Sequence, residues 1–146
     1  MSAKYGKAIG EEARYREKDV LLGPGVNIYR TPMNGRNFEY MGEDPYLASV
    51  MCVPYIQELQ KNGVAACVKH YALNNQELWR GHIDVNLSDR ALHEIYLPAF
   101  KAAVEEGGAW SIMGAYNKIR GQHACHNDFT LNKILKDDWK LSLIHI

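Results

Sequence analysis

The segment VAACVKHYALNNQE, residues 64–77, places an apolar run directly before two polar side chains. Residues 64–68 are small or branched and apolar, which is typical of a buried strand. Lys69 and His70 follow, where a strand buried on both faces should stay apolar. A cation and an imidazole at the end of a core strand indicate a binding site at that edge of a sheet, unless both residues are purely structural.

The patterns on either side of this segment alternate between helix and strand. A helix is expected from residue 45 to a cap at Gly63, because Asp44 suits the N-cap and Pro45 the first helical position. Pro54 should kink it. Its apolar residues at helical spacing are Leu47, Val50, Met51, Tyr55 and Leu59. The same signals predict helices over 2–17, from a Ser88 cap to Gly107 or Gly108, and over 127–139 with Asn127 as cap, and strands at 19–22 and 109–117.

This alternation predicts an α/β fold with parallel strands covered by helices, since the expected strands are apolar almost throughout. No glycine-rich nucleotide fingerprint follows the first strand, because GPGVN lacks the third glycine and no helix follows at once. The polar residues come directly after strands, where a (β/α)8 barrel has its active site. We therefore expect a partial TIM-type barrel, and 146 residues would supply about half of the ~250 that a whole barrel needs.

Composition excludes several classes of function. The chain has 17 basic and 17 acidic residues, so its formal net charge of zero gives no electrostatic grip on nucleic acid or an anionic membrane. No apolar run approaches the ~20 residues of a membrane span. The N-terminus, MSAKYGKAIGEEAR, has no apolar signal core, which favours the cytoplasm if the chain starts at the natural N-terminus.

The cysteines and the histidines near them do not form a spaced framework. Cys52, Cys67 and Cys125 are odd in number and have apolar neighbours, so we expect reduced and mostly buried thiols. The HACHN segment brings His123, Cys125 and His126 too close together for a standard structural zinc site. We expect a loop there, and no metal or other cofactor.

Polar residues near the ends of the three expected strands suggest one binding site. Arg36 lies in the long loop after the first strand, Lys69 and His70 end the second, and Tyr116 and Asn117 end the third. If these loops meet at one rim, the rim is rich in hydrogen-bond donors and suits a neutral ligand with many hydroxyl groups, such as a sugar. Four aromatic residues could pack on the apolar face of the ring: Phe38, Tyr40, Trp79 and Trp110.

Each of these residues, considered alone, could instead have a purely structural role. Lys69 could extend past the strand end and pair with a surface acid, and His70 could be a satisfied core imidazole. Arg36 alone could be an ordinary ion-pair partner. Glu77 is the acid nearest to this cluster of donors in the sequence, and Trp79 with Arg80 could border the entrance.

Four blocks of sequence resemble the N-terminal barrel domain of family 3 glycoside hydrolases, most closely the β-glucosidase branch. The resemblance covers about residues 5–140. The blocks, in chain order, are GPGVNIYRTPMNGRNFEYMGEDPYL, GVAACVKHYALNNQE, SDRALHEIYLPAF and WSIMGAYNKIRG.

The resemblance implies a retaining mechanism, in which one carboxylate attacks the anomeric carbon and a second carboxyl group protonates the leaving oxygen. It also implies that Arg36, Lys69 and His70 hold hydroxyl groups of the terminal sugar, and that Met113 and Tyr116 line the same subsite. The full protein is then an exo-acting β-glucosidase that hydrolyses terminal β-linked glucose. A β-xylosidase or arabinosidase of the same family, or a non-catalytic carbohydrate-binding relative, is the alternative.

The chain departs from the family pattern at the residues that perform the chemistry. The nucleophile of the family is an Asp on the strand after the ILKDDW helix, and the acid/base usually comes from a following domain, so both lie outside this chain. Asp137 and Asp138 fall within the helix pattern and are not assigned the role. We expect residues 1–140 to be an incomplete domain that is inactive alone, and residues 141–146, LSLIHI, to be a non-native tail that resembles a translated sequencing adapter.

Overall fold

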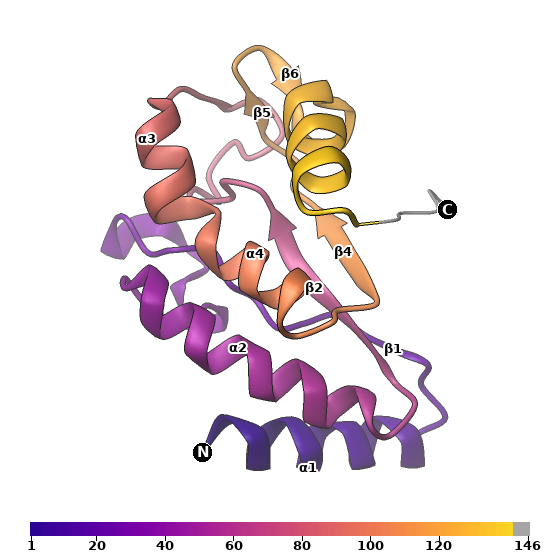
Figure 1. Cartoon of the computed structure of the whole chain (residues 1–146). Helices are drawn as coiled ribbons and strands as arrows, with labels where there is room; N and C mark the ends of the chain where they lie inside the picture. Colours follow the sequence, from indigo (N-terminus) through magenta and orange to yellow (C-terminus); the bar gives the residue numbers. More distant parts are fainter. Residues whose placement is uncertain (142–146) are drawn as a thin grey trace.

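The strand predicted from VAACVKHY is the centre of the sheet. The computed structural model describes residues 1–141, and in it β2 (Ala65–Tyr71) lies between β1 (Val20–Leu21) and β4 (Ser111–Gly114). Both neighbours are parallel to β2 (Figure 1). This arrangement confirms the α/β class with a parallel sheet.

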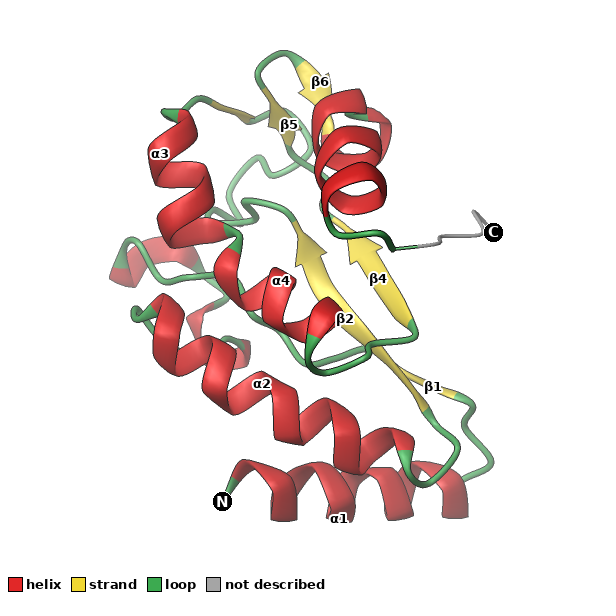
Figure 2. Cartoon of the chain, in the orientation of Figure 1, coloured by secondary structure: helices red, strands yellow, loops and turns green. Residues whose placement is uncertain are grey.

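Helices cover this sheet as the alternating pattern predicts (Figure 2). α2 (Pro45–Gln60) and α4 (Pro98–Glu105) pack on each other and on β2, and α1 (Ser2–Tyr15) packs on α2. A Cβ at Gly6 or Gly10 would collide with the α2 backbone at Tyr55 or Leu59. Glycine at these two positions therefore allows the close approach of α1 to α2.

The helix α2 begins as predicted, and its buried face includes only the C-terminal half of the predicted stripe, Tyr55 and Leu59. The Asp44 side chain accepts hydrogen bonds from the backbone N–H groups of Tyr46 and Leu47, at 2.7 and 3.0 Å. Leu47 and Val50, predicted on the inner stripe, are each 50% exposed. The buried residues are Ala48, Cys52, Tyr55, Ile56 and Leu59. α2 packs on α1, α4 and β2 through small residues as well as large ones, so the large apolar side chains revealed only part of the buried face.

The helix predicted from Ser88 is divided into three pieces. Ser88 caps α3 (Asp89–Ala91), a wide turn follows at η3 (Leu92–Tyr96), and α4 starts at Pro98. Pro98 has no N–H to donate, and the N–H of Leu97 bonds to the carbonyl of Leu92, five residues back, at 3.0 Å.

Residues 84–123 contain a small second sheet that was not predicted. It consists of β3 (Asp84–Val85), β5 (Lys118–Ile119) and β6 (Gln122–His123), in the order β3-β5-β6. A 3₁₀ turn, η4 (Ala124–His126), leads to the last helix, η5 (Phe129–Asp138). Asn127 caps this helix as predicted, because its Oδ1 accepts the N–H of Thr130 at 2.9 Å.

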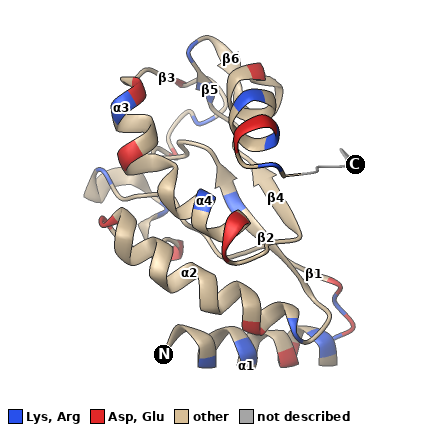
Figure 3. Cartoon of the chain, in the orientation of Figure 1, with Lys and Arg blue, Asp and Glu red and all other residues tan. Residues whose placement is uncertain are grey.

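The thiols are free and mostly buried, as predicted. Cys52 and Cys67 are buried, and Cys125 is exposed on the turn η4. Within residues 1–141, no group of three His, Cys, Asp or Glu side chains could hold a metal ion. Figure 3 shows acidic and basic residues interspersed along α1 and along the last helix.

Two further observations concern the extent of the chain. Among the helices of the described part, none is long and apolar enough to cross a membrane. All but the first residue of the predicted tail 141–146 lies outside the described residues.

Candidate functional site

The candidate site lies at the carboxyl end of β2, where the regular ladder of the sheet stops. Lys69 exchanges backbone hydrogen bonds with the segment after β1: its N–H donates to Pro24 at 3.0 Å and its carbonyl accepts from Val26 at 2.9 Å. The register against β4 then shifts between Lys69 and Tyr71. His70 is the residue at this irregularity.

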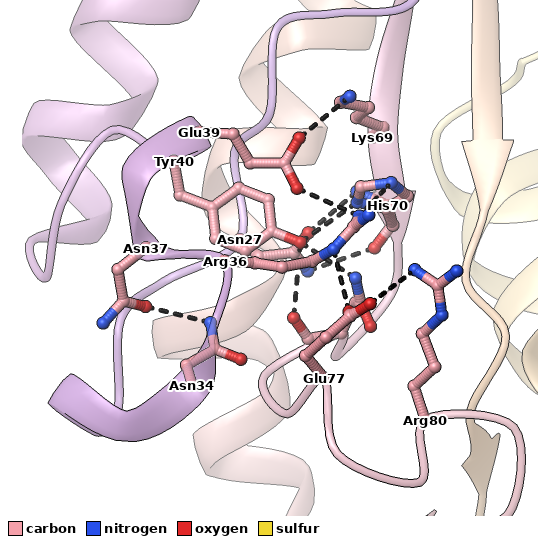
Figure 4. Close-up of polar contacts among 11 residues, drawn as sticks. Asn27, Asn34, Arg36, Asn37, Glu39, Tyr40, Lys69, His70, Glu77 and Arg80 are labelled. Carbon is pink, nitrogen blue, oxygen red and sulfur yellow. Dashed lines mark hydrogen bonds and ion pairs between the residues drawn. The ribbon is translucent and has the colours of Figure 1, made fainter.

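The side chain of Asn27 takes over the pairing of the His70 backbone (Figure 4). Its Oδ1 accepts the His70 N–H at 2.8 Å, and its Nδ2 donates to the His70 carbonyl at 3.0 Å. Both residues are buried, at 2% and 6% exposure. The amide therefore satisfies two buried main-chain groups that would otherwise lack partners.

The His70 ring is enclosed by partners that fix its tautomer. Arg36 Nη1 lies 3.1 Å from Nε2, and because a guanidinium can only donate, Nε2 must be the acceptor. The proton of the neutral ring is then on Nδ1, which donates to the Tyr40 hydroxyl at 3.0 Å. Asn74 Nδ2 donates to the same hydroxyl at 2.9 Å. In this state His70 fits the alternative of a satisfied core imidazole.

This environment keeps the ring neutral. Burial, and next the positive charge of Arg36, lower the pKa of His70 from 6.5 to about 4. Glu39 opposes this shift without overcoming it. The ring is thus an uncharged acceptor at neutral pH.

Charged side chains form an alternating row beside the ring (Figure 4). Lys69 Nζ is 2.9 Å from Glu39 Oε2, and Glu39 Oε1 is 3.0 Å from Arg36 Nη1. Arg36 Nε is 2.8 Å from Glu77 Oε2, and Glu77 Oε1 is 3.0 Å from Arg80 Nη1. We call these five side chains, Lys69, Glu39, Arg36, Glu77 and Arg80, the ionic row. Lys69 therefore pairs with an internal acid instead of a surface one.

Residues of β4, and of the segment that follows it, lie beside the ionic row. The Arg80 guanidinium carbon lies 4.6 Å from the centre of the Tyr116 ring, and Met113 is the register partner of Lys69 on β4. All five predicted site residues, Arg36, Lys69, His70, Met113 and Tyr116, thus lie at the same end of the sheet. Asn117 is instead a structural residue, 2% exposed, whose amide donates to the carbonyl of Ala72.

The aromatic residues proposed as a sugar platform do not all lie at this end. Tyr40 is 6% exposed and serves as the hydrogen-bond partner of His70, so its face cannot receive a ligand. Trp110 directly precedes β4. Its backbone N–H donates to Oε1 of Gln60 at the end of α2, near the amino ends of the strands. Phe38 and Trp79 are exposed, and each lies within two residues of a member of the ionic row, Glu39 and Glu77 or Arg80 respectively.

Glu39 and Asn27 are the site residues that sequence reasoning missed. A signal for Glu39 was present, because it follows Arg36 by three residues, and a half-buried arginine near a lysine needs an acid partner. Nothing in the sequence marked Asn27 as the residue that pairs with the His70 backbone.

The arrangement suits a neutral ligand with hydroxyl groups. Each hydroxyl can donate to a carboxylate or to His70 Nε2 and accept from a lysine or arginine, so the alternating charges match it without requiring a net charge on the ligand. The charged side chains of Lys69, Glu39 and Arg36 are only 16–22% exposed, which strengthens such hydrogen bonds relative to those at an open surface.

The lowered pKa of His70 predicts a specific loss of stability in acid. In the unfolded chain His70 takes up a proton as the pH falls below 6.5, whereas in the folded chain it does so only near pH 4. The free energy of unfolding therefore decreases as the pH drops through this window. At about 1.4 kcal/mol per tenfold change in proton affinity, the contribution is about 3 kcal/mol. Urea denaturation from pH 7 to pH 4 should show a weaker pH dependence for His70→Gln than for the parent. The exposed His93→Gln should behave like the parent, and equal slopes for His70→Gln and the parent would contradict a neutral buried ring.

Comparisons with known proteins find relatives along nearly the whole chain. The chain is 84% identical over 139 residues to a β-glucosidase of Bacteroides ovatus, which is 95% of this chain and 19% of that protein. It is 46% identical over 136 residues to an exo-α-(1→6)-L-arabinopyranosidase of Bifidobacterium longum, covering 93% of this chain and 18% of that protein. The structure of β-glucosidase 3B from Thermotoga neapolitana in complex with glucose matches with a TM-score of 0.92 at 46% identity, over 94% of this chain and 19% of that one.

The chain thus spans about a fifth of the length of the relatives that it matches. The family model for the glycosyl hydrolase family 3 N-terminal domain matches residues 1–142, nearly all of the chain. The chain therefore belongs to glycosyl hydrolase family 3, as part of its N-terminal domain.

Proposed function

We propose that the protein to which this chain belongs is a retaining, exo-acting β-glucosidase, and that this chain binds the terminal glucose. The observation that carries the proposal is the meeting of Arg36, Lys69 and His70 at the carboxyl end of β2. The β-glucosidase names of relatives at 84% and 45% identity support the substrate class, as does the neighbouring structure with bound glucose.

In this proposal Arg36 and Lys69 donate hydrogen bonds to hydroxyl groups of the sugar, and His70 presents Nε2 as an acceptor once a hydroxyl displaces Arg36 Nη1. Met113 and Tyr116 line the same subsite from β4. Contacts that strengthen as the ring flattens toward the oxocarbenium ion lower the barrier, since only interactions that are stronger in the transition state raise the rate.

The described carboxylates near the sugar site are a poor match for the two catalytic groups. Glu39 and Glu77 each lie between two cations, an arrangement that suits a structural partner better than a nucleophile or an acid. Asp138 is on the outer side of the last helix and pairs with Lys133 at 2.9 Å. We propose that the nucleophile and the acid/base are supplied by other parts of the protein.

We also propose that the parallel sheet is one sector of a (β/α)8 barrel, with residues 1–140 as an incomplete domain. Three features support the barrel: the parallel order β1-β2-β4, the helices that pack beside the strands, and a polar site at their carboxyl ends. β4 is only half-buried along its whole length, as expected for a strand whose outer neighbour is absent.

The sugar-binding roles can be tested in a complete enzyme. This chain can replace the matched 139-residue segment of the Bacteroides ovatus β-glucosidase, which gives a chimera that carries every residue discussed above. Lys69→Ala and His70→Ala should each lower kcat/KM for an aryl β-glucoside by about a hundredfold or more, in a chimera that stays folded. Lys101→Ala, on the exposed face of α4, should leave kcat/KM unchanged. Unfolding of both site variants without a specific kinetic loss would support the structural alternative.

The isolated 146-residue chain should not hydrolyse an aryl β-glucoside, because the proposal assigns it neither catalytic carboxyl group. The complete protein should hydrolyse it, in preference to an aryl β-xyloside and an aryl α-L-arabinopyranoside. Turnover by the purified isolated chain would refute the assignment of the catalytic groups to other parts of the protein. Preference for the arabinopyranoside would place the protein with the Bifidobacterium relative instead.

A further inference from the structure

Glu77 occupies an unusual position, between two arginines from different parts of the chain. Its Oε2 lies 2.8 Å from Nε of Arg36, 41 residues earlier in the sequence, and its Oε1 lies 3.0 Å from Nη1 of Arg80. Half of the ion pairs of the described residues join exposed residues four or five apart. A pair that links two loops at a partly buried site holds them in a defined geometry, whereas a surface pair contributes little.

Backbone contacts also hold Glu77 in place, in addition to its side-chain ion pairs. Its N–H donates to the carbonyl of Asn34 at 2.9 Å. Gly35, with a φ of 87°, is so close that a Cβ there would lie 3.1 Å from the Glu77 Cβ. The loop that contains Glu77 and the turn that precedes Arg36 are therefore in direct contact. This contact places the Glu77 carboxylate beside the Arg36 guanidinium.

The partners of Arg36 contact two of the three nitrogen atoms of its guanidinium. Glu77 reaches Nε, while Glu39 and His70 reach Nη1. These two carboxylates restrain the guanidinium by charge from two sides, since neither Glu39 Oε1 nor Glu77 Oε2 has a hydrogen-bond partner among the described residues. Nη2 is the amino group outside these contacts. A donor that is already oriented loses less conformational entropy when a hydroxyl binds.

Arg80 completes the connection to the third strand. It is 33% exposed, it lies over the Tyr116 ring, and its pair with Glu77 holds that carboxylate from the side opposite to Arg36. The ion pair with Arg80 therefore helps to fix the Glu77 carboxylate in the position where it contacts Arg36.

We propose that Glu77 is a positioning residue that orients the Arg36 guanidinium for the hydroxyl groups of the terminal sugar. This inference rests on the proposed function, since it assumes that Arg36 binds the sugar. Glu77 itself does not need to touch the ligand. Its effect on binding must then disappear when Arg36 is absent.

A double-mutant cycle in the chimera tests this dependence. Glu77→Gln keeps the size of the side chain and removes its charge. With a fluorogenic aryl β-glucoside, this change should lower kcat/KM by about tenfold to a hundredfold, and it should raise the inhibition constant of glucose in parallel with KM. In an Arg36→Ala background the same change should alter kcat/KM by less than about twofold, because no guanidinium remains to be oriented.

The controls separate this role from a merely structural one. Glu94→Gln removes an exposed ion pair of similar length, Arg90 to Glu94 at 3.0 Å, and should leave kcat/KM and thermal stability unchanged. An equal loss from Glu77→Gln in both backgrounds, or no loss in either, would overturn the positioning role while leaving the proposed function intact. Full activity of Arg36→Ala would overturn both, since Arg36 would then not bind the sugar.

Discussion

The pairing of the Asn27 side chain with the His70 backbone is the constraint on which the site depends. In a regular strand, neighbouring side chains point to opposite faces of the sheet. Yet Lys69 and His70 both reach the same group of side chains, Lys69 through Glu39 and His70 through Arg36. The strand must therefore become irregular here, which leaves the main-chain groups of His70 without ladder partners. Asn27 supplies both partners and makes the irregularity tolerable in a buried setting.

The ionic row is hard to explain as a source of stability alone. Partly buried ions lose hydration, and well-packed apolar residues in their place are often neutral or stabilising. Here five charged side chains and a neutral imidazole share the end of a core strand, each in contact with the next. Such a row provides donors and acceptors in alternation at fixed positions, which is what recognition of adjacent hydroxyl groups requires.

The sequence predicted the parts of this structure that depend on local chemistry. Lys69 and His70 were conspicuous because polar residues interrupted an apolar run, and Asp44 and Ser88 were recognisable caps. The parts that were missed depend on contacts between distant segments. The buried face of α2 is set by three neighbours, and small residues such as Ala48 face them while Leu47 and Val50 do not. Tyr40 was expected to face a ligand, but its hydroxyl is committed to a ring 30 residues away.

The central claim is that Arg36, Lys69 and His70 form one hydroxyl-binding surface. The most direct test is a crystal structure of the complete protein with bound glucose. The account predicts one glucose at the carboxyl end of β2, with Arg36, Lys69 and His70 each within hydrogen-bond distance of its hydroxyl groups. A glucose bound elsewhere, with the ionic row unchanged and in contact only with itself, would contradict it.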